Sequence, residues 1–323
     1  YNNLGNVLLE LGNLEDSVSC YKKVIELNPK FSAAHNNLGN ALKALDQIDD
    51  ARKSYEDAIK INPNSAASHN NLGNILSKEL NQLDEAVKSF HRAIEIDPNF
   101  LSAHNNLGHT LCKLDKYDAA VKSYENALDV NHDSNYIFGN ILNTKMNYCN
   151  WDDFQSQIKE LIFRINKDEK VIEPFILMGL IDDLVLQRKV TELRINNLHP
   201  KSDILPKLDF YPRHKKIRIG YFSADFREHP VGYLTAELYE LHDRNCFEVH
   251  AFSFGQDTND EMNLRIKAGV DHYHDVDLMS HKEIALLARS LEIDIAIDLG
   301  GLTAEARTDI FAMSAAPIQI SYI

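Results

Sequence analysis

The chain has 323 residues, with 34 Lys or Arg and 48 Asp or Glu, so its formal net charge at pH 7 is −14. At roughly 150 residues per domain, this length predicts about two domains. The acidic balance argues against a nucleic-acid binder, because such a surface repels phosphate backbones. No run of about 18 apolar residues predicts a membrane span, and the start, Tyr1 to Leu4, has no signal-peptide core.

Four cysteines without a CxxC pair give no sign of a disulfide framework or of a structural zinc site. We therefore expect a cytoplasmic protein without nucleic-acid or membrane partners. The first residue is Tyr1, not Met, and the last six residues, from Ile318 onward, form an apolar run. These two features lead us to expect a piece of a longer protein.

The first part of the chain is repetitive. Asn-Asn-Leu-Gly occurs four times, and the glycines are spaced by 34, 34 and 35 residues. A recurrent aromatic residue and an Asn-Pro or Asp-Pro pair follow in most units. This period and pattern resemble the tetratricopeptide repeat, in which two helices pair and stack on the next pair. We predict an α-solenoid of about four repeats over residues 1–134, the first of them truncated.

The period is lost in the next stretch, which we interpret as a helical linker region over residues 135–214. Residues 152–165 and 174–188 predict helices without the repeat signature. Three prolines, Pro200, Pro206 and Pro212, then predict an extended segment, because proline cannot continue a helix or a central strand.

Residues 215–323 predict an α/β region of Rossmann type, since short apolar runs alternate with helical stretches. Buried strands are expected over residues 217–222, 247–254, 293–299 and 317–323. Helices are expected over residues 231–242, 259–268, 281–291 and 304–313. In a doubly wound parallel sheet, ligands bind outside the carboxyl ends of the strands. The loops after Phe222 and Leu299 are therefore the expected binding region.

These two loops carry the candidate site residues. Neither loop has the G-x-G-x-x-G fingerprint, and the chain has no P-loop or G-x-S-x-G motif. His229 follows the first strand, where an imidazole suits general-base work. Gly300 and Gly301 follow a later strand, and their amides could bind an anionic or hydroxyl-rich ligand, with Thr303 as N-cap of the next helix. The alternative is that the glycines only form a tight turn and Thr303 only caps a helix.

Taken in order, the repeats, the run Ile217 to Phe226, His229-Pro230 and the run Ile293 to Leu299 resemble the O-linked N-acetylglucosamine transferase family, nearest to its bacterial SPINDLY-like branch. The resemblance implies an inverting, metal-independent glycosyltransferase with two facing Rossmann-like domains (GT-B), of which residues 215–323 would be the first half. A nucleotide sugar would be the co-substrate, with no cofactor. The nucleotide-binding half of such enzymes would follow Ile323, so we expect no turnover from this chain alone.

The resemblance also assigns roles. It implies that His229 is the catalytic base, with a donor phosphate oxygen as the rival proton acceptor. It implies that Gly300, Gly301 and Thr303 line the sugar and acceptor site. Many relatives have a second histidine where Tyr233 stands and an aromatic residue or histidine where Leu302 stands, so donor or acceptor preference can differ.

The solenoid has its own candidate residues, four asparagines that recur once per repeat. We predict that they form a ladder on the concave face and bind the backbone of protein acceptors, because an amide offers two donors and an acceptor. The alternative is that they bond to neighbouring helices and support the superhelix. The four are Asn3, Asn37, Asn71 and Asn106.

The run Asp271 to Asp277 contains H-x-H and D-x-D, which can indicate a metal site. We interpret it instead as a polar segment that ends a strand and starts a loop, and predict no metal site. Two other functions remain open. One is a repeat-based adaptor with a non-catalytic Rossmann-like region, and the other is the same fold using GDP-fucose rather than UDP-N-acetylglucosamine.

Overall fold

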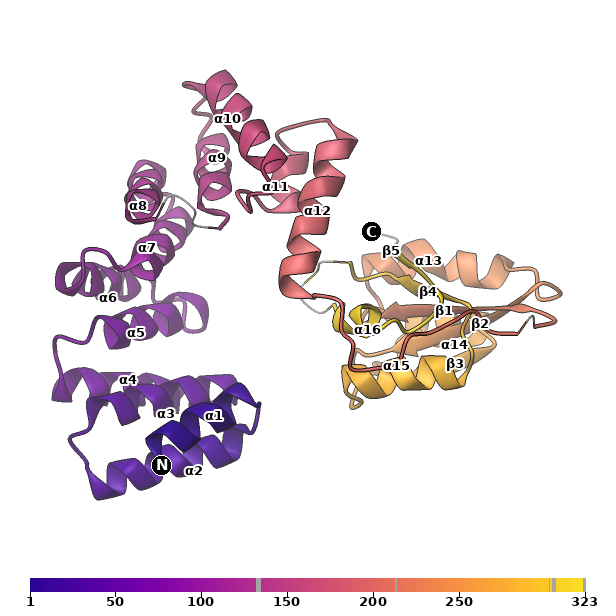
Figure 1. The fold of residues 1–323 in the computed structure, drawn as a ribbon, viewed down its shortest axis with the longest axis horizontal. Coiled ribbons are helices and arrows are strands. Elements are labelled where there is room, and N and C mark those ends of the chain that lie inside the picture. The colour runs from indigo at the N-terminus through magenta and orange to yellow at the C-terminus, as the bar shows by residue number, and fades with distance from the viewer. Residues whose placement is uncertain (132–134, 213, 302, 304–305, 322–323) are drawn as a thin grey trace. The chain divides into compact units, whose positions relative to one another are not determined.

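The computed structural model describes residues 1–131, 135–212, 214–301, 303 and 306–321. Contacts divide the chain into two compact units, Tyr1–Arg194 and Ile195–Ile323 (Figure 1). The boundary lies inside the region predicted as a helical linker, so most of that region packs with the repeats. Among the described residues, no helix has both the length and the apolar character needed to cross a membrane.

The first unit starts with four helix pairs, which confirms the predicted solenoid. Each pair joins a first helix carrying Asn-Asn-Leu-Gly, or its counterpart, to a second helix of 14 residues. The pairs are α1 (Asn2–Glu10) with α2 (Leu14–Leu27), α3 (Ser32–Ala44) with α4 (Ile48–Ile61), α5 (Ala66–Lys78) with α6 (Leu83–Ile96), and α7 (Leu101–Lys113) with α8 (Tyr117–Val130).

The glycine of each repeat has a steric reason. A Cβ built on Gly39 would lie 2.5 Å from a ring carbon of Tyr55, and one on Gly73 would lie 2.7 Å from the ring of Phe90. The aromatic side chain of the second helix therefore occupies the place of the missing side chain on the first. Since the rings are fully buried, this contact sets how closely the two helices of a repeat approach.

Four more helices complete the first unit around their own apolar cluster. The predicted helix over 174–188 is in fact two helices, because the chain turns after Met178. The second helix starts at Leu184, after Asp183, whose Oδ1 accepts from the amides of Val185 and Leu186. The helices are α9 (Ile137–Asn147), α10 (Phe154–Asn166), α11 (Pro174–Met178) and α12 (Leu184–Leu198).

The second unit is a parallel sheet of five strands in the order β3-β2-β1-β4-β5, which confirms the α/β prediction. One strand was not predicted, because His-Tyr-His-Asp is too polar to read as a buried strand. The strands are β1 (Ile217–Ser223), β2 (Phe247–Ser253), β3 (His272–Asp275), β4 (Ile295–Asp298) and β5 (Ile318–Ser321).

Helices cover both faces of this sheet (Figure 1). Tyr221 and Val249 pack toward α13 and α14, whereas Phe222 and Phe252 pack toward α15 and α16. The predicted helix over 304–313 is shorter in the structure: residues 304 and 305 lie outside the described residues, residues 306–308 are not helical, and α16 begins at Asp309. The helices are α13 (Pro230–Leu241), α14 (Glu261–Gly269), α15 (His281–Ser290) and α16 (Asp309–Ala312).

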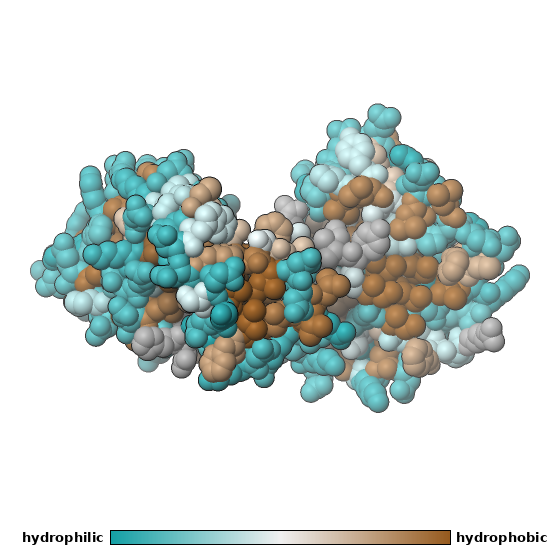
Figure 2. All heavy atoms as spheres, turned by 90° about the horizontal axis from the view of Figure 1, so that it is seen from above, coloured by the Kyte–Doolittle hydropathy of each residue, from teal (hydrophilic) through white to brown (hydrophobic). Residues whose placement is uncertain are grey.

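Apolar side chains also remain on the surface of this unit. Figure 2 shows them as brown side chains among the polar ones. Leu234 and Leu241 on α13 are 81% and 73% exposed, and Ile318 and Ile320 on the edge strand β5 are 42% and 45% exposed. The described residues of this unit therefore leave part of their apolar surface uncovered.

Candidate functional site

The two predicted loops leave neighbouring strands at the same edge of the sheet. Phe222 of β1 pairs with Asp298 of β4, and the amide of Leu299 donates to the Phe222 carbonyl over 3.1 Å. The chain places β2 and β3 on one side of β1 and β4 and β5 on the other. This reversal of strand order is the switch point at which α/β sheets bind ligands.

His229 is the N-cap residue of α13, at the end of the loop that follows β1. Its Nδ1 lies 3.3 Å from the amide of Val231, which donates to it, and 3.5 Å from Oδ2 of Asp225. The side chain is 39% exposed. Nδ1 therefore faces two competing partners, while no hydrogen bond of Nε2 is found among the described residues.

These two contacts require different tautomers. When Nδ1 accepts from Val231, the proton of a neutral imidazole is on Nε2, which can then donate but not take up a proton. When Nδ1 carries the proton and faces Asp225, Nε2 has a free lone pair. Only the second arrangement makes His229 a base at Nε2.

Sequence reasoning did not single out Asp225, although it stands four residues before His229. Its carboxylate is 14% exposed and also pairs with Arg227 over 3.1 Å. Backbone packing fixes the loop around it: a side chain on Gly255 would collide with the Ala224 carbonyl, and one on Gly232 would collide with the Arg227 carbonyl. The loop thus holds the Asp225 carboxylate beside Nδ1 of His229.

The second loop differs from its prediction. The amides of Gly300 and Gly301 both donate to Oδ1 of Asp298, over 2.9 and 3.1 Å, so they are not free to bind a ligand. Burial raises the pKa of Asp298, and the two amide hydrogen bonds oppose this rise. Asp298 is therefore the residue that shapes the loop, and sequence reasoning missed it.

The expectation that Thr303 caps a helix was also wrong. Thr303 is an exposed bend residue whose amide donates to the Gly300 carbonyl, and the N-cap position of α16 belongs to Thr308. Gly301 has φ +55°, a left-handed conformation that favours glycine. The alternative interpretation of the glycines as a tight turn fits these contacts, and Leu302 lies outside the described residues.

The predicted asparagine ladder is mostly engaged in hydrogen bonds between neighbouring repeats. The Asn37 amide donates to Asn6 over 3.1 Å, and the Asn106 amide donates to Asn70 over 3.0 Å. Asn71 donates to both Asn36 and Asn40, over 3.1 and 3.2 Å. Both N–H donors of Asn71 are then used, which leaves only its carbonyl oxygen for a peptide. Asn3, in the first helix, is exposed.

The polar run Asp271 to Asp277 ends a strand at Asp275 and then enters a loop, as predicted, but the strand itself was not predicted. Residues His272–Asp275 are the edge strand β3 itself, paired in parallel with β2. This pairing brings His272 beside His250 and next to Glu248, two residues that sequence reasoning did not connect with the run. No local signal could have joined them, because the partners are more than 20 residues apart in the chain.

Comparison with known proteins supports the sequence resemblance. Residues 184–323 match the model of glycosyl transferase family 41, and tetratricopeptide repeat models match residues 5–46, 39–79, 77–115 and 102–134. A probable UDP-N-acetylglucosamine peptide N-acetylglucosaminyltransferase, SEC of Arabidopsis thaliana, is 40% identical over 109 residues, which are 34% of this chain and 11% of that protein. SPINDLY of the same plant, named as a probable enzyme of this type, is 30% identical over 155 residues, 46% of this chain and 16% of that protein.

A solved O-GlcNAc transferase mutant from Thermobaculum terrenum is 22% identical, with a TM-score of 0.48, and the alignment covers 90% of this chain and 50% of that one. The alignments to the two plant relatives span about a tenth and a sixth of the length of those proteins. The family matches divide the chain much as its contacts do. Residues 184–323 thus match glycosyl transferase family 41, and they follow residues that match tetratricopeptide repeats.

Proposed function

We propose that the protein transfers a sugar from a nucleotide donor to Ser or Thr hydroxyls of other proteins, and that the donor is UDP-N-acetylglucosamine. The family match supports a transferase, and the names of the two plant relatives support this donor and a peptide acceptor. The observation that carries the proposal is the position of His229. It lies beside the switch point of the sheet, with a carboxylate facing one ring nitrogen.

The proposed step is an inverting displacement that needs no metal ion. The acceptor hydroxyl oxygen attacks the anomeric carbon, and the bond from that carbon to the donor phosphate oxygen breaks. The diphosphate leaves with the electron pair, while the hydroxyl proton passes to Nε2 of His229. Proton transfer of this kind contributes about 10² to 10⁴ in rate.

Asp225 has a positioning role in this step. Its carboxylate favours the tautomer with the proton on Nδ1, and it stabilises the imidazolium that forms when Nε2 takes up the second proton. The amide of Val231 favours the opposite tautomer, since it needs Nδ1 as an acceptor. Closure of the 3.5 Å gap between Nδ1 and Oδ2 therefore switches His229 from a helix cap to a base.

The solenoid is proposed to hold the protein acceptor. The side-chain N–H groups of Asn71 are used between repeats, so Asn71 can bind a peptide only as an acceptor. Its carbonyl oxygen would accept from peptide N–H groups. Asn37 is placed in the same way, with its amide donating to Asn6 and Asn2. Binding through such scattered acceptors reads the backbone of an extended peptide and not its side chains, which suits an enzyme with many acceptors.

The test compares His229→Asn with His229→Ala in the natural protein that carries this chain. Asparagine is a good N-cap residue, so His229→Asn keeps the start of α13 but removes the base. Radiolabelled transfer from UDP-N-acetylglucosamine and, in parallel, from GDP-fucose to a host lysate is the assay. We expect His229→Asn to lose at least about 100-fold in transfer at an unchanged melting temperature, and His229→Ala to lose stability as well.

Three results would change the proposal. Full transfer by His229→Asn would leave His229 as a cap and favour a donor phosphate oxygen as the proton acceptor. Transfer from GDP-fucose alone would replace the donor. No transfer by the parent from either donor would favour the adaptor, whose repeats bind partners without catalysis.

A further inference from the structure

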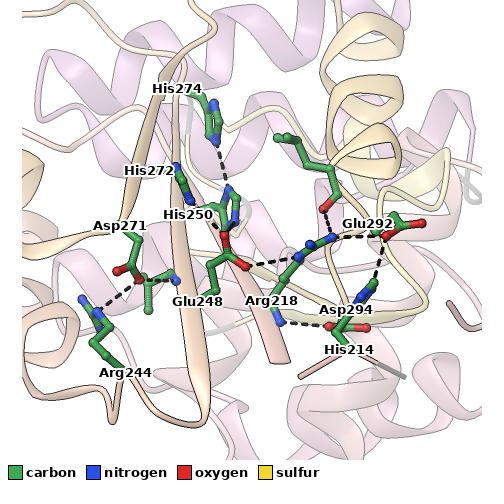
Figure 3. A network of polar contacts seen from close by, with 12 residues as sticks. His214, Arg218, Arg244, Glu248, His250, Asp271, His272, His274, Glu292 and Asp294 are labelled. Atoms are coloured by element: carbon green, nitrogen blue, oxygen red, sulfur yellow. Dashed lines mark hydrogen bonds and ion pairs between the residues drawn. The ribbon is translucent and has the colours of Figure 1, made fainter. Parts of the chain in front are cut away.

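A cluster of histidine and glutamate side chains lies at the amino ends of β2 and β3, away from the loops discussed above (Figure 3). In the strand register, His250 of β2 pairs with His272 of β3, and Glu248 is two residues before His250. Because side chains alternate along a strand, these three side chains share one face of the sheet. The ladder of backbone hydrogen bonds therefore fixes their relative positions.

The distances within this cluster are short. Nε2 of His272 lies 2.9 Å from Oε1 of Glu248, and Nε2 of His250 lies 3.7 Å from the same oxygen. One ligand atom from each of the three residues lies within 4.8 Å of the others. Four-coordinate zinc holds N and O ligands at about 2.0–2.2 Å, which places the ligands roughly 3.3 to 3.6 Å apart. The side chains thus need to move by about an ångström or less to surround an ion of that size.

One atom in the cluster has no partner. His250 is only 3% exposed, and its Nε2 is a buried atom without a hydrogen-bond partner among the described residues. Its Nδ1 lies 3.0 Å from Nε2 of His274. When Nδ1 donates to His274, the lone pair of Nε2 points toward Glu248 and His272 with nothing to bind. A buried polar atom in this state is costly, and a ligand would satisfy it.

We propose that Glu248, His250 and His272 bind one divalent transition-metal ion, zinc, which joins the edge strand β3 to β2. Two imidazoles and a carboxylate are a ligand set of zinc and not of magnesium or calcium, which prefer oxygen. His272 is 48% exposed, so solvent supplies the fourth ligand. The proposed site lies on strand residues and not on the loops that carry His229.

The surroundings of the three ligands support this assignment. Metal-binding histidines usually donate their other ring N–H to an acceptor, as His250 can to His274. The second oxygen of Glu248 accepts from Arg218 over 3.2 Å, which orients the carboxylate.

The site is also far from the loops at the carboxyl ends. Glu248 stands five residues before Ser253, the last residue of β2. At about 3.3 Å per residue, this corresponds to about 16 Å along the strand. The ion would therefore act on the sheet and not on the sugar or on His229.

The experiment titrates the 323-residue chain with Co²⁺, whose visible absorption reports four-coordinate binding, and then displaces the cobalt with Zn²⁺. We expect one site per chain and a higher melting temperature with zinc, because a ligand that binds only the folded state stabilises it. His272→Gln and Glu248→Gln should each weaken binding by more than about 100-fold. His274→Gln should weaken it by about 10- to 100-fold, as for other outer-shell partners.

His91→Gln is the matched control, because His91 is an exposed histidine outside the cluster. It should leave the absorption, the affinity and the melting temperature with zinc unchanged. His272 is half exposed, so its substitution should leave the fold intact, which circular dichroism checks. No cobalt absorption in the parent, or equal binding by the parent, His272→Gln and Glu248→Gln, would overturn the proposal and leave a hydrogen-bonded histidine cluster with only adventitious surface binding.

Discussion

The loop after β4 depends on one carboxylate oxygen, and replacing Asp298 by alanine tests this directly. In the parent, Oδ1 of Asp298 accepts from the amides of Gly300 and Gly301, and all three residues are buried. In Asp298→Ala both amides lose their acceptor. A buried donor without a partner costs about 1–3 kcal/mol, so two such amides predict a loss of roughly 2–4 kcal/mol in the free energy of unfolding, after allowing for the desolvation of the carboxylate that the variant avoids.

Asp298→Asn is the matched control, because its amide oxygen can still accept from both glycines. It should lose less than about 1 kcal/mol. Trp151, the one tryptophan of the chain, lies in the first unit and does not report on the second. Hydrogen exchange of peptides from β1 and β4 therefore measures the stability, and exchange at Gly300 and Gly301 measures the loop itself. Equal losses for the alanine and asparagine variants would refute the role given to Oδ1.

The stability difference between the parent and Asp298→Asn should depend on pH. Burial raises the pKa of Asp298 in the folded state above that of the unfolded chain. The folded state then binds more protons in the window between the two pKa values, so protonation stabilises the fold. This stabilisation is fully present below the unfolded pKa and is lost as the pH rises through the folded pKa. The parent should therefore gain stability relative to Asp298→Asn as the pH falls through that window, and a constant difference would contradict the assignment.

Two further predictions concern the solenoid. Gly39→Ala should lower the free energy of unfolding of the first unit by about 1–3 kcal/mol, because the new Cβ would lie 2.5 Å from the ring of Tyr55. Urea unfolding followed by circular dichroism measures this loss. Adding Tyr55→Leu to Gly39→Ala should restore part of it. Asn71→Ala should cost about 1–2 kcal/mol, since it removes hydrogen bonds to Asn36 and Asn40, and unchanged stability with lost peptide binding would instead assign Asn71 to the peptide.

Much of the fold could be predicted because its signals are local. The repeat was predictable from the spacing of Gly39 and Tyr55, since the ring of Tyr55 packs where Gly39 has no side chain. The central strands were predictable because they are apolar runs. β3 could not be predicted, since an edge strand with two histidines has no apolar run, and pairing with β2 alone makes it a strand. The break between α11 and α12 was not predicted, because Asp183 lies within a largely apolar stretch and was not interpreted as a helix cap.

The candidate site could be predicted only in part. His229 ends the loop between a predicted strand and a predicted helix, so its place at the sheet edge needed no long-range information. The amides of Gly300 and Gly301 were expected to be free, yet Asp298 stands two residues earlier, and a short aspartate side chain commonly bonds to amides two and three residues onward. That signal was present in the sequence, and it favours a closed turn over an anion site.

The two ends of this sheet suit different chemistry. At the carboxyl ends, backbone groups leave the ladder, and side chains such as Asp225 and Asp298 hold the loops. At the amino ends, His250 and His272 are fixed by the strand register, and their rings lie 4.5 Å apart between centroids. The proposed metal ion would need ligands that move little, whereas the proposed transfer requires His229 to exchange one hydrogen-bond partner for another. The sheet thus carries the proposed coordination site on strand residues and the proposed catalytic residue on a loop.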